Sequence, residues 1–389
     1  MAITNSENII SQINSNIFFK EFTFSKNDFK ELNTNQKLEF ADNVVWLDTL
    51  FFIYQIKERE PNSKNSDVKW FENKILKKAV KQIKSTLKYI STYPEIFIEN
   101  EKGHKLDIIK AKECINPKKI IVYLPPDSFP ESKRHLKFYE SSEIGLIHLF
   151  HSEDYYWICK YLITPAEIEE YLNFREHLFL FDKTKSNELP EQYFLAHFLE
   201  TLNADHFEPA YISNLQTHNP DIKKFDVSYI IDNFSKNIKL LNHQTEYYPI
   251  IQEIAKLNRS ELSEFKKRIL LSIENSESEE MILPYRIYLP ATDCGFIFIP
   301  LHSKNTQYWK TALYNFTMAH KYDTKATRCI GVIVVRDQKD LENFEFYWQF
   351  VDEEWIYDEA IEKALTVNYP FRKTKMKKVD NRYKNDGYQ

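Results

Sequence analysis

Residues 41–59, ADNVVWLDTLFFIYQIKER, decide how we expect the first half of the chain to fold. β-Branched and aromatic residues lie on both sides of Asp48-Thr49, which is typical of two strands joined by a tight turn. A two-residue turn there would place Asp42 opposite Gln55, with Cβ atoms about 5 Å apart. Lys57 shares the face of Gln55 because side chains alternate along a strand. The stretch therefore predicts a carboxylate, an amide and an ammonium together at the open end of a hairpin.

The composition indicates a folded chain of two domains. Its 389 residues exceed what one core usually holds, roughly 250–300 residues, and 43% of them are hydrophobic. The four cysteines form no C-x-x-C pair, which favours reduced thiols. No run approaches the roughly 20 apolar residues of a membrane span, and the N-terminus lacks a signal-peptide pattern. We therefore expect a cytoplasmic protein with no membrane partner.

Glycine is scarce, with five residues in the whole chain. A P-loop, a G-x-G-x-x-G dinucleotide fingerprint and a G-x-S-x-G nucleophile elbow each need closely spaced glycines, because only glycine tolerates their backbone conformations. The sequence therefore excludes P-loop ATPases, protein kinases, Rossmann dehydrogenases and serine hydrolases of the elbow type.

The order of expected elements predicts an α/β protein with two domains. Residues 1–181 read as a helix, the hairpin, a long helix over 68–91 and two strands, which together make a small α/β sandwich. DKTKSNELP (182–190) is the linker candidate. The second domain, 190–389, has a mostly helical middle over 191–275 and then a second α/β block. That block follows the order hairpin, helix, strand, strand, so a degenerate repeat and generic α/β patterning both remain open.

Positive charge gathers in two places although the net charge is −5. Residues 57–88 hold ten Lys or Arg against four Asp or Glu, and the tail 371–389 holds seven against two. On the long helix, lysines three and four residues apart form one ridge, consisting of Lys74, Lys77, Lys81, Lys84 and Lys88. The ridge predicts a surface for nucleic-acid phosphates. A solvated helix face and a solubilising tail are the alternative interpretation.

Asp42, twelve residues and then Gln55-Ile56-Lys57 resemble the signature of the PD-(D/E)xK, or restriction-endonuclease-like, nuclease superfamily. The variant is the Q-x-K form of its Mrr-like and NERD-like members, and the likeness covers roughly residues 5–150. In that family the aspartate and the second position hold a divalent metal, and the lysine orients the attacking water. The resemblance implies that Asp42, Gln55 and the Ile56 carbonyl bind Mg²⁺ or Mn²⁺, with Lys57 as the catalytic lysine.

The implied activity is hydrolysis of DNA, or of RNA, by a magnesium-dependent nuclease in restriction, phage defence or DNA repair. Phosphodiester hydrolysis needs a hard cation held by oxygens, with open positions for water and phosphate. Glu39 is a further candidate ligand or water positioner if the strand begins after it, and Gln82 is a candidate for the edge of the site. Two departures from the pattern are the neutral Gln55 and the absence of a proline before Asp42.

Other interpretations of the chain stay open. The neutral Gln55 is compatible with an inactive nuclease-like domain that binds nucleic acid without cutting it. A protein-interaction scaffold would leave the hairpin end merely solvated. The C-terminal half could serve a homodimer or a protein partner. His148-x-x-His151 is a weak candidate for zinc, because it lacks helical i,i+4 spacing and a clear third ligand.

Overall fold

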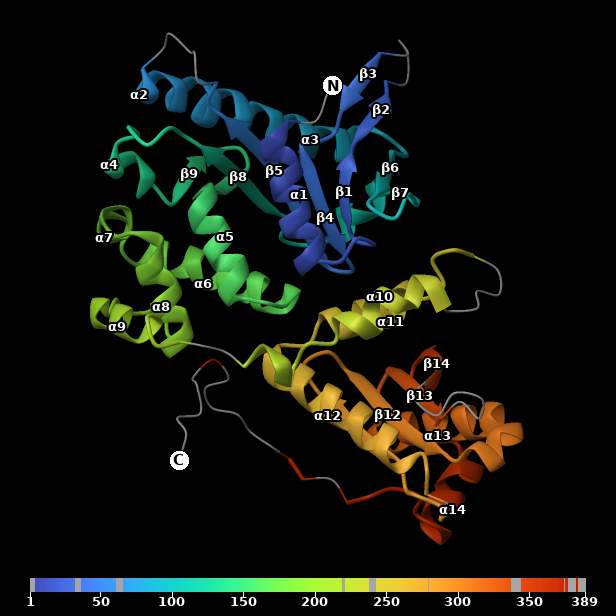
Figure 1. The fold of residues 1–389 in the computed structure, drawn as a ribbon. Helices are drawn as coiled ribbons and strands as arrows, with labels where there is room; N and C mark the ends of the chain where they lie inside the picture. Colours follow the sequence, from blue (N-terminus) through green and yellow to red (C-terminus); the bar gives the residue numbers. More distant parts are fainter. Residues whose placement is uncertain are drawn as a thin grey trace. The chain divides into compact units, whose positions relative to one another are not determined.

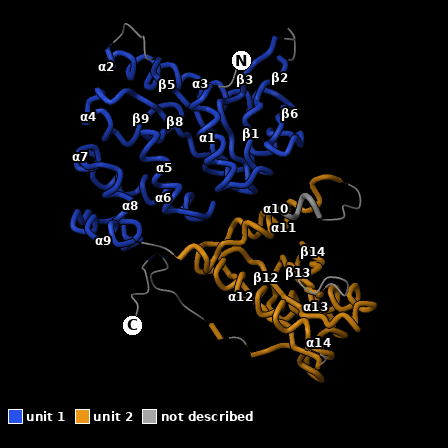
Figure 2. Tube along the Cα trace, viewed as in Figure 1, with its two compact units in different colours: residues 1–220, 383–389 blue, residues 221–382 orange. Residues whose placement is uncertain are grey.

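The chain divides into two compact units (Figure 1 and Figure 2). The computed structural model describes residues 4–31, 36–60, 66–218, 221–237, 243–278, 280–336, 344–373, 375–376 and 383. Unit 1 comprises Met1–Pro220 and Tyr383–Gln389, and unit 2 comprises Asp221–Arg382. Both contain helices and strands, which confirms the α/β class. Most of the basic tail lies outside the described residues. Within the described ranges, every helix is too short or too polar to cross a bilayer.

The boundary between the units differs from the linker expected at residues 182–190. Lys183–Glu188 form helix α7, and Ser186 within it is fully buried. Asp182 caps this helix by accepting a hydrogen bond from the backbone of Lys185 at 3.0 Å. The polar residues that suggested a linker are therefore a capped helix inside unit 1, since Asp before a short polar segment is also a helix start.

Unit 1 is built on an eight-stranded mixed sheet with the order β7-β6-β1-β4-β5-β8-β10-β9, and β2 pairs with β3 beside it. Its strands are β1 (Thr23–Lys26), β2 (Asp28–Lys30), β3 (Lys37–Glu39), β4 (Asn43–Leu47), β5 (Leu50–Glu58), β6 (Phe97–Asn100), β7 (Lys105–Asp107), β8 (Lys118–Leu124), β9 (Phe138–Ser141) and β10 (Gly145–His151). Its helical segments are α1 (Asn5–Ile17), α2 (Asp67–Trp70), η1 (Phe71–Ala79), α3 (Val80–Thr92), η2 (Ile108–Glu113), α4 (Glu131–Arg134), α5 (Ser152–Tyr161), α6 (Pro165–Phe181), α7 (Lys183–Glu188), α8 (Glu191–Glu200), η3 (Pro209–Tyr211) and α9 (Ile212–Leu215).

The hairpin β4–β5 lies at the centre of this sheet and has the predicted register. Leu47 pairs with Leu50 and Asn43 with Tyr54, so Asp48-Thr49 is the two-residue turn. Asp48 adopts a φ of 51°, in the left-handed region that Asp tolerates better than most residues. Strand β5 runs parallel to β8, and the connection between them comprises the long helix followed by β6, β7 and η2.

Different helices cover the two faces of the sheet. Ile53 packs in an apolar cluster with Ile90 of α3, whereas the next residue, Tyr54, hydrogen-bonds Tyr155 of α5 at 2.9 Å. Since neighbouring strand residues point to opposite faces, α3 and α5 lie on opposite sides. Asn14 of α1 joins the second side, because its amide donates to Asn43 at 2.7 Å and its oxygen accepts from Tyr155 at 2.6 Å. This buried chain holds α1 and α5 against the residues next to Asp42 and Gln55.

The long helix predicted over 68–91 extends from Asp67 to Thr92. Its buried side chains recur on one face, as expected for an amphipathic helix, and include Phe71, Ile75, Ala79 and Ile83. The segment η1 (Phe71–Ala79) is wound as a π-helix, with i→i+5 hydrogen bonds. Such segments are rare and are frequently found at functional sites.

Unit 2 contains a four-stranded sheet with the order β11-β12-β13-β14. Its elements are η4 (Ile222–Lys224), α10 (Ser228–Asn237), α11 (Tyr248–Ala255), α12 (Arg259–Asn275), β11 (Tyr285–Leu289), β12 (Cys294–Leu301), η5 (Ser303–Tyr308), α13 (Trp309–Thr324), β13 (Arg328–Arg336), β14 (Phe344–Asp352) and α14 (Glu359–Val367). The mostly helical middle and the second α/β block are therefore present as predicted.

Unit 2 also has a hairpin, a helix and a parallel strand in that order, although its hairpin loop is longer (residues 290–293) and the polar residues of unit 1 are absent from it. Strands β11 and β12 are antiparallel, and β12 runs parallel to β13 across α13. Counted from the hairpin turn, Asp42, Gln55 and Lys57 correspond to Pro284, Ile299 and Leu301. The last strand differs, because β14 pairs antiparallel with β13 whereas β10 runs parallel to β8. The carboxylate, amide and ammonium at the open end of the hairpin are therefore a feature of unit 1, and the equivalent positions of unit 2 lack them.

A fully buried arginine ties the helical side of unit 1 to its sheet. Arg175 of α6 donates to Glu191 of α8 at 2.7 Å, to the Lys137 carbonyl at 3.0 Å and to the Leu149 carbonyl at 3.0 Å. The Arg175 side chain is 0% exposed and that of Glu191 is 5% exposed. Because the pair is buried, removal of Arg175 would leave the Glu191 carboxylate with only the Lys137 ammonium, 3.8 Å away, to balance its charge.

The two histidines that had suggested zinc have other partners. His148 lies with one ring nitrogen 3.1 Å from Arg175 and the other 2.9 Å from Glu176, and burial lowers its pKa to about 4. His151 accepts a hydrogen bond from the backbone of Glu153 at the start of α5. Both rings therefore have structural roles.

We predict that Arg175→Leu destabilises unit 1 by about 3–5 kcal/mol, because Glu191 would keep a buried charge with no guanidinium beside it. The measurement is urea unfolding of the full chain, followed by circular dichroism.

Lys183→Leu is the matched control, since Lys183 pairs with Glu140 with both side chains about half exposed. It should change stability by less than about 1 kcal/mol. Equal effects of the two variants would contradict the role given to Arg175.

Candidate functional site

Asp42 lies just before β4 and faces the end of β5, as the hairpin register predicts. Its Oδ2 accepts hydrogen bonds from the backbone N of Ile56 at 2.6 Å and from Lys57 Nζ at 2.5 Å. The Asp42 side chain is 3% exposed and that of Lys57 is 14% exposed. A charged hydrogen bond in such a dry setting is stronger than its surface equivalent. The carboxylate and the ammonium therefore form a recessed ion pair.

Gln55 completes the predicted group of three. Its Oε1 accepts a hydrogen bond from Lys57 Nζ at 3.0 Å, and the residue is 1% exposed. Lys57 thus donates both to a carboxylate and to an amide oxygen. The structure brings together the three residues that the sequence placed at the hairpin end, while their chemical roles stay predictions.

Glu39 reaches the same region because the strand that carries it ends there. It is the last residue of β3 and pairs with Asp28, and β4 starts only at Asn43. This break meets the condition under which Glu39 could share a site with Asp42. Burial raises the pKa of Glu39, and the charges of Asp42 and Glu7 raise it further.

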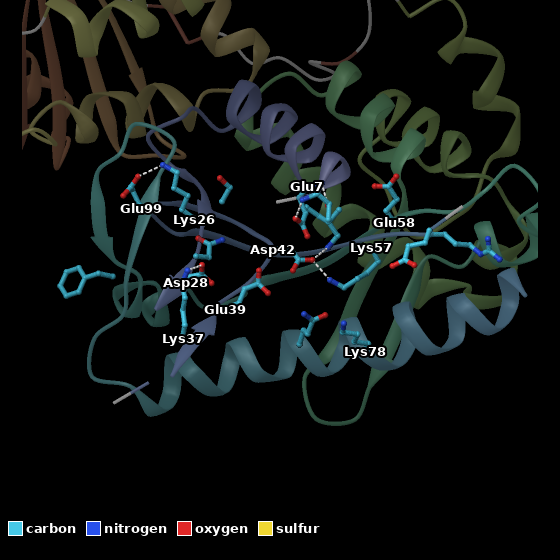
Figure 3. A pocket seen from close by; sticks show the side chains of 18 of the residues that line it. Glu7, Lys26, Asp28, Lys37, Glu39, Asp42, Lys57, Glu58, Lys78 and Glu99 are labelled. Carbon is cyan, nitrogen blue, oxygen red and sulfur yellow. Dashed lines mark hydrogen bonds and ion pairs between the residues drawn. The ribbon is translucent and has the colours of Figure 1, made fainter. Parts of the chain in front are cut away.

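Asp42, Lys57 and Glu39 line one cavity of about 780 Å³ in unit 1, whereas Gln55 is buried behind Lys57 and does not line it. Its lining comes from the start of α1, the strands β1, β2, β3, β5, β6 and β7, and the long helix. Figure 3 shows Glu99 and Lys26 toward one end of the cavity and the Asp42–Lys57 pair toward the other, with Glu58 above and Lys78 below Lys57. The strands lie between α1 and the long helix in this view. The cavity is therefore an elongated trough with the Asp42–Lys57 pair inside it.

The basic ridge of the long helix meets this trough only at its edge. Gln82 and Lys78 line the cavity. The residues predicted to hold phosphates, Lys74, Lys77, Lys81, Lys84 and Lys88, do not line it. Lys84 instead pairs with Glu143 at 2.6 Å. Their proposed contact with nucleic acid stays a prediction.

The sequence reasoning missed Glu7 and Lys78. The Thr4-x-x-Glu7 capping box could have indicated where α1 begins, since both of its reciprocal hydrogen bonds are present. It could not indicate that this helix start lies beside Asp42, because the two are far apart in the chain. Lys78 was passed over in favour of its neighbour Lys77, although it also lies four residues after Lys74 and three before Lys81.

The oxygen donors around the Asp42–Lys57 pair fit a hard divalent cation better than a soft one. Asp42 supplies a carboxylate and Gln55 an amide oxygen. Ile56 also lines the cavity, and its carbonyl points to the same side of the strand as its N–H, which binds Asp42. Two buried amide oxygens in the lining, Asn27 Oδ1 and Gln82 Oε1, have no hydrogen-bond partner among the described residues.

The charge of this donor set is low. Across the described part of the chain, no three His, Cys, Asp or Glu side chains gather in a way that could hold a metal ion. A cation here would rest on one carboxylate and neutral oxygens, with Glu39 nearby. Since cation affinity rises with the number of charged ligands, we expect weak binding.

Comparison of the chain with protein-family models, with curated proteins and with solved structures found no match.

We predict that Glu39→Gln raises the melting temperature of the metal-free protein at neutral pH. Because burial and neighbouring carboxylates raise the pKa of Glu39, the folded state gains stability from its protonated form at acid pH and loses that gain as the pH rises through the raised pKa. The amide has no charge to bury, so the variant avoids this loss. The measurement is thermal unfolding in EDTA as a function of pH.

The melting temperatures of the variant and the wild type, plotted against pH, should converge below pH 4.5, the ordinary pKa of the carboxyl group. Glu143→Gln, at a side chain 68% exposed, is the control and should bring no gain at neutral pH. A Glu39→Gln protein that is less stable than wild type at every pH would refute the prediction that the ionised Glu39 carboxylate destabilises the folded state.

Proposed function

We propose that unit 1 is a divalent-metal-dependent nuclease that hydrolyses phosphodiester bonds of DNA. The observation that carries the proposal is that Lys57, which lines a polar trough with Asp42, donates to both Asp42 and the buried Gln55. This arrangement combines a carboxylate, neutral oxygens and a fixed ammonium within hydrogen-bond reach. Phosphodiester hydrolysis requires these groups, since it needs oxygen ligands for a cation and positive charge for the phosphate.

Asp42, Gln55 and the Ile56 carbonyl would hold Mg²⁺ or Mn²⁺, with Glu39 and Gln82 at the edge of the site. When bound, such a cation lowers the pKa of a coordinated water and offsets charge that develops on the phosphate. The phosphate and the attacking water would be positioned by side chains of the protein. Lys57 presents a compact positive charge to the phosphate and a donor to the attacking water. Its low exposure keeps that charge poorly screened by solvent.

A second candidate function is nucleic-acid binding without turnover. It is favoured by the neutral Gln55 and by the ion pair in which Lys57 already balances the charge of Asp42. A site of this kind would attract phosphate through its lysines and would not respond to a divalent cation. Metal dependence of cleavage therefore separates the two candidates.

We predict that the full-length protein cleaves DNA in Mg²⁺ or Mn²⁺ and not in EDTA, and that Asp42→Asn and Lys57→Ala each lower the rate by about a hundredfold or more. The assay compares supercoiled plasmid, linear duplex, single-stranded DNA and RNA of matched length. Circular dichroism of each variant checks that the fold is kept.

Lys183→Leu, outside the trough, is the control for loss of a lysine and should cleave at the wild-type rate. Metal-dependent cleavage that survives both site variants would place the activity elsewhere. Folded protein that binds DNA without cleaving any substrate would favour the second candidate, and protein without DNA affinity would refute both.

We further predict that Lys78 contributes one phosphate contact to binding. Each neutralised phosphate adds about −0.9 to the slope of log K against log salt on duplex DNA, or about −0.7 on a single strand. Lys78→Ala should reduce the magnitude of the slope by about that amount. The measurement is fluorescence anisotropy of a labelled oligonucleotide in EDTA over a range of salt concentrations.

Lys84→Ala is the matched comparison on the same helix. Because the Lys84 ammonium binds Glu143, its removal should change the slope less. A larger effect of Lys84→Ala would instead favour the lysine ridge of the long helix as the surface that binds phosphates.

A further inference from the structure

The Asp42–Lys57 pair lies recessed between two helices. The start of α1 contributes Thr4 and Glu7 to one wall of the trough, and the long helix contributes Lys78 and Gln82 to the other. Figure 3 shows α1 above and the long helix below the pair. Duplex DNA presents its phosphates on a wide and stiff cylinder, whereas an unpaired strand is flexible and narrow enough to follow a groove. The recess therefore favours a single strand at the reacting position.

The end of the trough that is lined by β1, β6 and β7, here called its arm, combines an aromatic ring with lysines on a single face of the sheet. Phe97 and Glu99 lie on the same face of β6 because they are two residues apart. Glu99 pairs across the strands with Lys105 of β7 and with Lys26 of β1. The Lys26 ammonium bonds Glu99 at 2.8 Å. Lys26 and Lys105 thus flank one carboxylate beside the ring, in an arm that also carries the Lys37–Asp28 pair.

The Phe97 ring is unusually open for a large apolar side chain. It is 52% exposed, and among the exposed large apolar side chains of the described residues it alone lines this trough. Its neighbour Ile98 points the other way into the core. An exposed ring beside lysines in a groove is the combination with which proteins hold unpaired bases, since every base offers a face for stacking.

We propose that the site acts on nucleic-acid strands with unpaired bases, one of which stacks on Phe97 while the flanking phosphates pass Lys105 and Lys26 toward Lys57. This inference rests on the proposed nuclease function and names its substrate class. Phe97 is then a specificity residue that selects single-stranded or frayed segments. Lys105 and Lys26 guide the backbone without sequence preference, because they contact phosphates alone.

The test measures binding and cleavage separately on the full-length protein. Binding of a labelled single strand and of the blunt duplex of the same sequence is measured by anisotropy in EDTA, so that no cleavage occurs. We expect tighter binding of the single strand. Phe97→Ala should lower that affinity by about tenfold or more and leave duplex binding unchanged, since one stacked base is lost. Phe97→Trp should restore single-strand binding, whereas Phe97→Leu should not.

Tyr156→Ala is the matched control, because Tyr156 is a 48% exposed aromatic residue of unit 1 outside the trough. It should leave both affinities unchanged. Thermal unfolding of Phe97→Ala should match wild type, given the exposure of the ring. In Mg²⁺, cleavage of the single strand should fall with its affinity.

The outcomes separate this inference from the proposed function. Metal-dependent cleavage that needs Asp42 and Lys57 but is equal on both substrates, or is insensitive to Phe97→Ala, would overturn the inference and leave the nuclease. Rescue by Phe97→Leu would also overturn stacking, because leucine keeps apolar area without an aromatic face. Absence of both binding and cleavage on every substrate would overturn the two proposals together.

Discussion

The carboxylate of Asp42 is the constraint around which the candidate site is arranged. It is almost fully buried and takes hydrogen bonds from the Ile56 backbone and the Lys57 ammonium. A buried charge is tolerated only when it is paired and hydrogen-bonded, so the register of β4 on β5 and the position of Lys57 depend on each other. A slip of one residue would turn Gln55 and Lys57 to the other face of the sheet and leave Asp42 without its partners. The two-residue turn at Asp48-Thr49 prevents that slip.

The rest of unit 1 supports this hairpin end from both faces. The buried chain from Asn43 through Asn14 and Tyr155 to Tyr54 ties α1 and α5 to the residues next to the site. On the other face, the long helix packs against the sheet and brings Lys78 and Gln82 to the trough. Unit 2 also has a hairpin followed by a connecting helix, with apolar residues at the equivalent positions. This contrast indicates that the polar residues of unit 1 are not required by the topology, which supports a functional reason for them.

Sequence reasoning predicted the local features of the site and missed the distant ones. The hairpin, its register and the convergence of Asp42, Gln55 and Lys57 follow from alternation and turn chemistry over a short stretch of chain. The ridge of lysines was also a correct description of one helix face. Its position relative to the trough could not be read from the sequence, since the rotation of a helix about its axis depends on which neighbours cover its apolar side. That rotation places Lys78 and Gln82, and not the ridge, along the trough.

The sequence by itself determined the α/β class, the exclusion of glycine-loop chemistries and the three residues at the hairpin end, because composition and strand alternation are local properties. Only the tertiary structure decided that Glu7 and Phe97 belong to the same trough. Their elements meet Asp42 through packing between segments far apart in the chain, and no periodicity records such contacts. The boundary between the units was decided in the same way, since Lys183–Glu188 form a helix capped by Asp182, whose buried Ser186 packs inside unit 1.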